Sequence, residues 1–145
     1  MALQRIIVFT LLIMAVNGKI YERCAFIEKL KEVPGLIGYK NYTAGDYVCL
    51  ASEGSGMDTS QHFSSTEYGM LQINSFWWCD DKETKGRKNL CGVLCEDLLD
   101  DDITDDLLCL KRIVKDPKGL KAWIPWTENC EGKDLSQYTK GCSCN

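Results

Sequence analysis

The sequence predicts a single α+β domain with two lobes, in which helices flank a small antiparallel sheet. Three observations favour this class. Segments 21–33 and 103–115 repeat apolar residues with helical spacing. Segment 64–74 has the short alternation and the turn residues of strands. Nine cysteines follow an N-terminal stretch typical of a secretory signal, which indicates a small secreted domain stabilised by disulfides.

Residues 1–18 are predicted to be a secretory signal peptide. Arg5 supplies the positive charge, an almost unbroken apolar run covers 6–16, and small or permissive residues follow at 16–18. The run is too short for a transmembrane helix, and no later segment could cross a membrane. We therefore expect a secreted, extracellular domain at residues 19–145, without a membrane partner.

The charge of this domain excludes some partners. Arg5 is the only charged residue of the predicted signal, so 16 basic and 21 acidic residues remain, for a net charge of −5. An anionic surface argues against nucleic acid as a partner and against tight adsorption to anionic bacterial walls.

The helices are predicted from periodicity and capping residues. The helical pattern of 21–33 ends at Pro34-Gly35. The loop that follows contains the N-glycosylation sequon Asn41-Tyr42-Thr43, with Asn41 as the acceptor. Thr43 is expected to cap a second helix that runs to about Glu53, where two nearby glycines break it.

Short strands are expected after Gly54 and Gly56, as far as about Ile73. Tyr68, Met70 and Gln72 alternate as in a short strand that Asn74-Ser75 ends.

Thr104 is expected to be the N-cap of a further helix, with Asp105 and Asp106 in its first turn. The apolar face of that helix consists of Ile103, Leu107, Leu110 and Val114. A helical clump at 121–126 and loose turns complete the chain.

The segment 64–79 carries the most specific functional pattern. It reads SSTEYGMLQINSFWWC, and its amides, carboxylate and paired tryptophans suit an open polar cleft that binds sugars. The segment resembles the signature STDYGIFQINS…WWC of c-type lysozymes and α-lactalbumins. The resemblance covers 19–142 and implies a lysozyme-like fold with a helical lobe and a β-lobe.

The resemblance also implies four disulfides. They would join Cys24 to Cys142, Cys49 to Cys130, Cys79 to Cys95, and Cys91 to Cys109. Cys144 is then left over. It could be capped by a small thiol, pair with another chain, compete with Cys142 for Cys24, or stay a free thiol; we otherwise expect a monomer.

Segment 96–106 holds seven acidic residues among eleven, a density that favours a bound cation. The segment resembles the calcium elbow KxxDDDxTDD of α-lactalbumins and calcium-binding lysozymes. That match implies a structural Ca²⁺ held by side chains of Asp100, Asp105 and Asp106 and by carbonyls of Asp97 and Asp102. Asp97 replaces the usual lysine, a change that a backbone ligand tolerates. The alternative is a solvated acidic lead-in to a capped helix.

The catalytic pattern is where the chain departs from lysozymes. Glycoside hydrolysis needs two carboxyl groups flanking the bond, one protonated and one ionised. The family places the acid in VCLAxxESG, and segment 48–56 reads VCLASEGSG, so the acid position is Gly54. Glu53 lies one residue early, a helical rotation of about 100°. Glu67 takes the second position, where lytic members carry aspartate, and the hairpin before it is shortened.

The remaining cleft residues match the family. By resemblance the sugar-contacting or site-shaping residues are Gln72, Asn74, Trp77, Trp78, Asp116, Ala122 and Trp123. Trp126 suits core packing or the site, and His62 suits a solvated surface position better than a replacement acid.

These observations predict a secreted calcium-binding protein of the lysozyme family. It would bind β-1,4-linked amino-sugar glycans, such as peptidoglycan or chitooligosaccharides, with weak or no muramidase activity. One alternative is an active lysozyme in which a local bulge returns Glu53 to the cleft. Another is an α-lactalbumin-like modulator of a galactosyltransferase, which fits Glu67 and the calcium elbow but not Ser52-Glu53 or the lysozyme-type ending.

Overall fold

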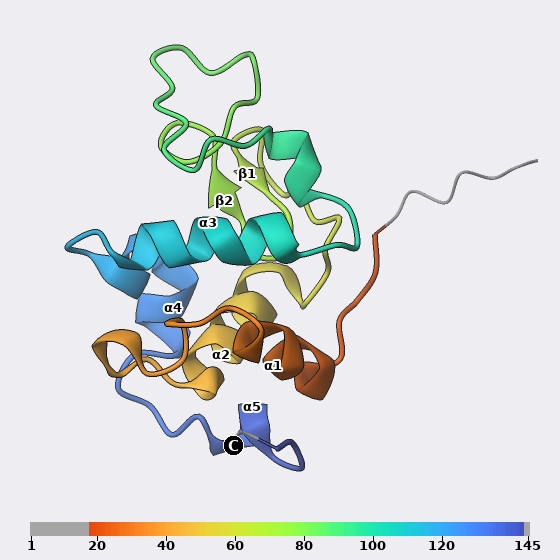
Figure 1. Cartoon of the computed structure of the whole chain (residues 1–145), viewed down its shortest axis with the longest axis vertical. Coiled ribbons are helices and arrows are strands. Elements are labelled where there is room, and N and C mark those ends of the chain that lie inside the picture. The colour runs from red at the N-terminus through yellow and green to blue at the C-terminus, as the bar shows by residue number, and fades with distance from the viewer. Residues whose placement is uncertain (1–17, 144–145) are drawn as a thin grey trace, which may run out of the picture.

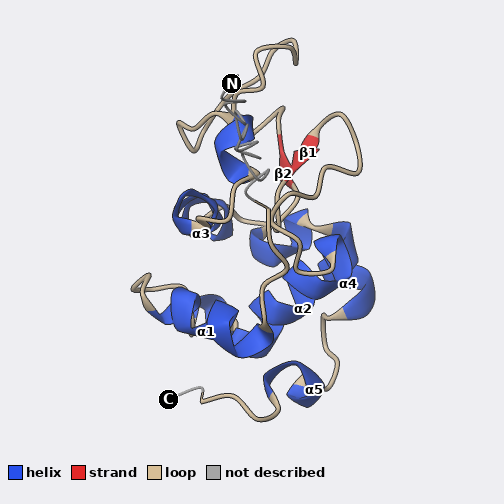
Figure 2. Ribbon diagram, turned by 90° about the vertical axis from the view of Figure 1, so that its right-hand side faces the viewer, coloured by secondary structure: helices blue, strands red, loops and turns tan. Residues whose placement is uncertain are grey.

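The computed structural model describes residues 18–143, so residues 1–17 of the predicted signal peptide and Cys144 lie outside the described residues. Two lobes are visible in Figures 1 and 2. The strands β1 (Glu67–Tyr68) and β2 (Ile73–Asn74) and their long loops form one lobe. Helices α1 (Arg23–Lys31), α2 (Ala44–Ser55), α4 (Ile124–Asn129) and α5 (Ser136–Thr139) form the other, and α3 (Thr104–Val114) lies between them. The predicted α+β class is confirmed.

The N-terminal helices follow their sequence signals closely. α1 buries Phe26, Ile27 and Leu30, and it is slightly shorter than the predicted segment 21–33. Thr43 caps α2 as expected: its hydroxyl accepts a hydrogen bond from the Asp46 N–H at 3.3 Å, and the Asp46 carboxylate accepts one from the Thr43 N–H at 2.8 Å. This capping box satisfies two N–H groups that the first helical turn leaves free.

The end of α2 corrects one prediction. Gly54 does not break the helix, which continues through it to Ser55. The helix ends at Gly56, whose φ of +65° is the left-handed conformation of a helix C-terminus. Gly54 is therefore held in regular helical geometry, a point that matters for the site below.

Short strands occur in this region as expected, but the alternating strand predicted from Tyr68, Met70 and Gln72 is wrong. β1 and β2 are separate two-residue strands, paired antiparallel with Glu67 opposite Asn74 and Tyr68 opposite Ile73. Between them the chain turns, with φ values of +80° at Gly69 and +48° at Gln72. Met70 and Leu71 are both buried because this turn packs inward, whereas a strand with one face on the core would bury only every second residue.

The predicted N-cap of α3 is also wrong by position. Thr104 is the first residue of the helix, and Ile103 occupies the cap position without a side-chain bond. The side chain that bonds the start of the helix is Asp102. Its Oδ1 accepts hydrogen bonds from the Thr104 N–H at 3.0 Å and the Thr104 hydroxyl at 2.6 Å. The predicted apolar face of this helix is confirmed, since Ile103, Leu107, Leu110 and Val114 are all buried.

The C-terminal region is more ordered than predicted. The clump expected at 121–126 is divided into a 3-10 turn at Gly119–Ala122 and the helix α4. Helix α5 stands where loose turns were expected. The Arg23 guanidinium fixes this end of the chain to α1, because it donates to the carbonyls of Gln137 at 2.8 Å and Lys140 at 3.1 Å.

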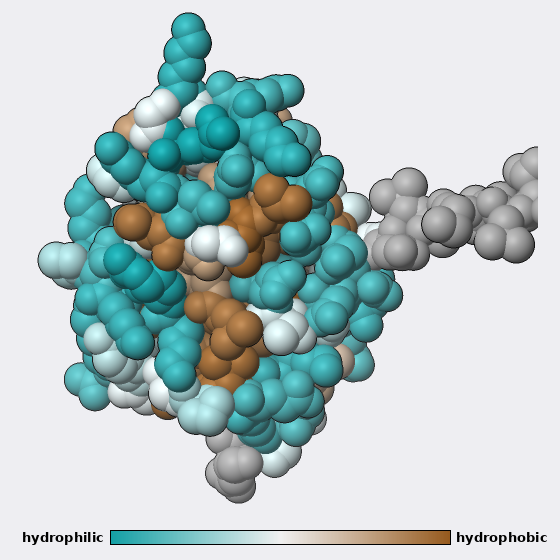
Figure 3. Space-filling view, turned by 45° about the horizontal axis from the view of Figure 1, so that its top comes forward, coloured by the Kyte–Doolittle hydropathy of each residue, from teal (hydrophilic) through white to brown (hydrophobic). Residues whose placement is uncertain are grey.

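Four disulfides join the elements, in the pairing that the resemblance implied: Cys24–Cys142, Cys49–Cys130, Cys79–Cys95 and Cys91–Cys109. The first closes a loop with a sequence separation of 118 and ties the two ends of the domain together. On the face drawn in Figure 3, apolar side chains lie along the middle and hydrophilic ones border them. None of the helices in residues 18–143 is long and apolar enough to cross a membrane.

We expect Gly69→Ala to destabilise the fold strongly. A Cβ there would lie 2.1 Å from the Leu98 carbonyl oxygen and 3.0 Å from Asp106 Oδ2, and φ is already +80°. The matched control is Gly132→Ala, which has a φ of +70° but no heavy atom within 4 Å of the new Cβ. Urea unfolding should show a loss of about 3 kcal/mol or more at Gly69, against about 1 kcal/mol at Gly132. Equal losses of stability in the two variants would show that the residues around Gly69 move aside for the new Cβ at little cost.

Candidate functional site

A cleft of about 580 Å³ lies between residues of the β-lobe and residues that follow α3. It brings together all seven of the predicted binding residues: Gln72, Asn74, Trp77, Trp78, Asp116, Ala122 and Trp123. Gly54 and Glu67 also line it, and the wall is completed by Ile113, Pro117, Lys118, Gly119, Ile124 and Pro125. The cleft is therefore built from three separate stretches of sequence, at 54, 67–78 and 113–125.

The three cleft tryptophans differ in exposure. Trp77 is 49% exposed, and its ring packs edge to face against Phe76 with centroids 4.8 Å apart. Trp78 is buried, and the Arg112 guanidinium lies 5.6 Å from its ring. Trp123 is buried and donates from its indole N–H to the Leu71 carbonyl at 2.7 Å. The two buried indoles are fixed, and Trp77 offers the open aromatic face.

The amides of the hairpin have one free acceptor. The Gln72 amide nitrogen donates to the Gly69 carbonyl at 2.7 Å and the Gln61 carbonyl at 3.0 Å. Its amide oxygen is buried and has no hydrogen-bond partner among the described residues. A buried acceptor without a partner is costly, and a ligand in the cleft could bond this oxygen only after the Gln72 side chain rotated toward it.

Glu53 and Gly54 occupy different sides of α2. Gly54 lines the cleft, whereas Glu53 is exposed and does not belong to the cleft wall. The Glu53 Oε1 accepts a hydrogen bond from the Tyr138 hydroxyl at 2.8 Å, on the side of α5. Burial, and then the bond to Glu53, raise the pKa of Tyr138 above its usual value. The regular helix thus directs the carboxylate toward α5.

Glu67 is half-buried at the cleft wall, and its position is held mainly through its backbone. Its carbonyl accepts a hydrogen bond from His62 Nδ1 at 2.8 Å. Within residues 18–143 no hydrogen bond or ion pair reaches the Glu67 carboxylate itself. His62 is exposed and its ring packs on Tyr68 with centroids 4.2 Å apart, so its role here is to support the hairpin.

Two basic residues that the sequence reasoning missed contact Asp116. Arg112 Nη1 donates to the Asp116 carboxylate at 2.8 Å, one helical turn away, and Lys40 Nζ donates to the Asp116 carbonyl at 2.7 Å. The i, i+4 spacing of Arg112 and Asp116 is a sequence signal that could have found the first pair. No local pattern points to Lys40, which comes from a distant loop.

The acidic segment contains one unusual carboxylate. Asp106 is fully buried, and neither of its oxygens has a hydrogen-bond partner on another described residue. Burial raises the pKa of the Asp106 carboxyl well above its usual range; its own N–H opposes this, and the charges of Asp100 and Asp105 add to it. Burial also raises the pKa of Asp100.

The expected calcium ligands have the oxygen atoms that Ca²⁺ prefers, but their side chains do not converge on one point. Carboxylate oxygens and carbonyls are the ligands that Ca²⁺ prefers, and the two unpartnered oxygens of Asp106 match such a role. In the described part of the chain, however, no three Asp, Glu, His or Cys side chains converge as a metal site requires. Asp100 accepts instead from the Asp102 N–H at 3.1 Å. Ion binding would therefore require rotation of the exposed Asp105 and the half-buried Asp100.

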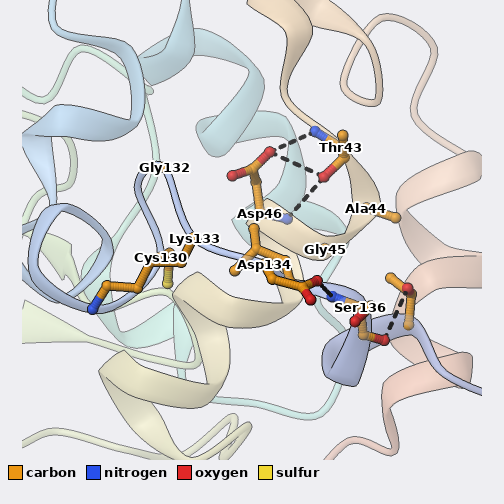
Figure 4. A pocket seen from close by; sticks show the side chains of 11 residues that line it. Thr43, Ala44, Gly45, Asp46, Cys130, Gly132, Lys133, Asp134 and Ser136 are labelled. Atoms are coloured by element: carbon orange, nitrogen blue, oxygen red, sulfur yellow. Dashed lines mark hydrogen bonds between the residues drawn. The ribbon is translucent and has the colours of Figure 1, made fainter.

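A second hollow lies between the start of α2 and segment 130–139 (Figure 4). Its charged groups have local partners. Asp46 belongs to the capping box and accepts from the Trp126 indole at 3.2 Å, and Asp134 accepts from the Ser136 N–H at 3.0 Å. Trp126, left open by the sequence, is buried and is not part of the cleft wall.

Comparisons with known proteins agree with this geometry. The family model "C-type lysozyme/alpha-lactalbumin family" matches residues 19–142. The chain is 48% identical to lysozyme C of Pelodiscus sinensis, over 86% of this chain and 98% of that protein. It is 47% identical to sperm acrosome-associated protein 5 of Mus musculus, over 95% of this chain and 88% of that protein. Lysozyme C-1 of Rattus norvegicus is 45% identical, over 92% and 93% respectively.

A lysozyme fold with four disulfides and a cleft between its lobes defines the class, and the chain belongs to the C-type lysozyme/α-lactalbumin family.

Proposed function

We propose that this protein is a secreted, calcium-binding member of the family that binds β-1,4-linked amino-sugar glycans in its cleft and has weak or no muramidase activity. Secretion is supported by the signal-like residues 1–18 and by the four disulfides, which form and persist in oxidising compartments. Calcium binding is supported by the buried Asp106 carboxylate.

The proposal of low activity rests on one observation, the positions of Glu53 and Gly54 at the end of α2. A retaining glycosidase needs a protonated carboxyl within about 5–5.5 Å of its partner across the bond. The residue at the cleft wall is Gly54, which has no side chain, and the Glu53 carboxylate is bonded to Tyr138. The cleft therefore has no residue of α2 that could protonate a departing sugar oxygen.

Glycan binding is supported by the rest of the cleft. Trp77 presents a half-exposed indole, on which a pyranose ring can stack. Gln72 lines the cleft with an amide, and Asp116 and Glu67 contribute carboxylates, so polar groups surround an apolar surface. This is the composition expected for sugar recognition.

Active muramidase is the second candidate. It is favoured by identities of 42–48% to proteins named lysozyme C and by the retained cleft residues. It requires the α2 terminus to rearrange so that Glu53 leaves Tyr138. An α-lactalbumin-like modulator is the third candidate, supported by family membership, Glu67 and the acidic segment.

The test is bacterial-wall turbidity measured beside calorimetric binding of a chitooligosaccharide. Binding without clearing supports the proposal. Clearing that disappears in Glu53→Gln supports the active lysozyme. Tyr138→Phe is a second test, because it removes the hydrogen bond to Glu53 without changing a charge. If clearing increases in that variant, Glu53 can act as the catalytic acid once Tyr138 no longer holds it.

We expect Trp77→Ala to weaken chitooligosaccharide binding about tenfold or more, because it removes the exposed stacking surface. Phe63→Ala is the control, since Phe63 is 68% exposed and outside the cleft wall. Isothermal titration calorimetry measures the affinity of both variants, and circular dichroism checks that they are equally folded. Unchanged affinity in Trp77→Ala would place the binding surface elsewhere.

A further inference from the structure

The N-glycosylation sequon lies beside one end of the cleft. Asn41 is exposed and its φ of +65° is a conformation that asparagine adopts more readily than most residues. Its neighbour Lys40 donates to the Asp116 carbonyl at 2.7 Å, and Asp116 lines the cleft. The residue on one side of the sequon acceptor is thus bonded to the cleft wall.

The residue on its other side contacts the same wall. The Tyr42 hydroxyl accepts a hydrogen bond from the Leu120 N–H at 3.1 Å. The packing here is close, since a Cβ on Gly119 would lie 2.2 Å from that hydroxyl oxygen, and Gly119 lines the cleft as well. Both sequence neighbours of Asn41 are thus bonded through their side chains to segment 116–120, on the side of the cleft that this segment lines.

We propose that Asn41 carries an N-linked glycan that restricts polymeric glycans from the 116–119 end of the cleft and leaves short oligosaccharides free to bind. This inference rests on the proposed function, because it requires secretion and a glycan-binding cleft. In the transfer, Asn41 Nδ2 forms a bond to the anomeric carbon of a lipid-linked oligosaccharide; the lipid pyrophosphate leaves, and the amide loses one proton. The attached glycan is bulky and hydrated.

Occupancy is tested on the full chain, expressed with its N-terminal leader in mammalian cells. Mass spectrometry of the intact protein, taken from the secreted and the cell-associated fractions, should show one attached glycan. Peptide N-glycosidase should remove that glycan. That enzyme converts a glycosylated asparagine to aspartate, so Asn41→Asp is chemically the same polypeptide without the sugar. Thr43→Ser keeps both the sequon and the capping hydroxyl and should stay glycosylated. A secreted wild-type chain without a glycan overturns the proposal.

Shielding is tested without relying on glycan binding. Lys118 is exposed on the cleft wall, and Lys85 is exposed in the segment between β2 and α3, outside the cleft wall. A polymer-linked amine reagent should label Lys118 at least about threefold more slowly in the glycosylated protein than in Asn41→Asp, whereas a small acetylating reagent should show no difference. Lys85 should react equally in both. Equal labelling of Lys118 by the bulky reagent overturns the shielding.

The functional consequence is measured with two ligands. Removal of the glycan should increase retention on insoluble peptidoglycan about fivefold, while the affinity for a chitooligosaccharide changes less than about twofold. Equal retention by both forms overturns the access role. If neither form binds the oligosaccharide, the proposed function fails, and the Lys118 labelling still decides whether the glycan covers that end of the cleft.

Discussion

Gly54→Glu is expected to give this protein bacterial-wall lysis at least about a hundredfold above wild type, the contribution typical of one general acid. The new side chain would start at the cleft wall, and no heavy atom lies within 4 Å of the new Cβ. Trp123 and Ile113 line the same cleft, and apolar neighbours raise the pKa of a carboxyl so that it stays protonated and can donate.

Gly54→Gln is the matched control, because it has the same length and shape but no proton to donate. Both variants replace a glycine inside α2 and should gain about 0.5–1 kcal/mol of stability, which confirms that the helix accepts the side chain. Adding Glu67→Gln to the glutamate variant should abolish the new activity if Glu67 is the partner. A folded Gly54→Glu without lysis would mean that Glu67 or the short hairpin is also disabling.

The helices were predictable because their signals are local. The apolar spacing of α1 and α3 and the capping box of α2 lie within a few residues of the structure they specify. The hairpin was not predictable in this way. Met70 and Leu71 are buried by tertiary packing of the turn, and Gln72 adopts a φ of +48° that its residue type does not announce. Periodicity cannot distinguish a buried turn from an alternating strand.

The cleft residues were predictable only through a motif. Segment 64–79 and the residues around Trp123 match a family pattern, and the structure brings them to one cleft. The contacts that decide their behaviour join distant positions: Glu53 to Tyr138, separated by 85 residues, and Lys40 to Asp116, separated by 76. A sequence pattern within one segment cannot predict such long-range pairs. The sequence alone therefore did not indicate that Tyr138 is the partner of Glu53.

Calcium is expected to raise the melting temperature by about 10 °C relative to chelator, because an ion that binds only the folded state adds about 3–4 kcal/mol at saturating concentration. The physical reason is the Asp106 carboxylate, which is buried without a partner on another residue. In chelator that group opposes folding as a charge, since burial disfavours its ionised form. Differential scanning calorimetry in calcium and in chelator measures the difference.

Asp106→Asn separates ion binding from general charge relief. In chelator this variant should melt at least as high as wild type, because it removes a buried charge, and it should gain little on addition of calcium. Asp101→Asn removes the same charge from an exposed neighbour outside the expected ligand set, and it should retain the calcium response. Because Asp106 Oδ2 lies against the turn at Gly69, an ion held there would also brace the hairpin that carries Glu67 and Gln72. Identical wild-type melting curves in calcium and in chelator would remove the calcium site from the proposal, and the acidic segment would then serve only as the lead-in to α3.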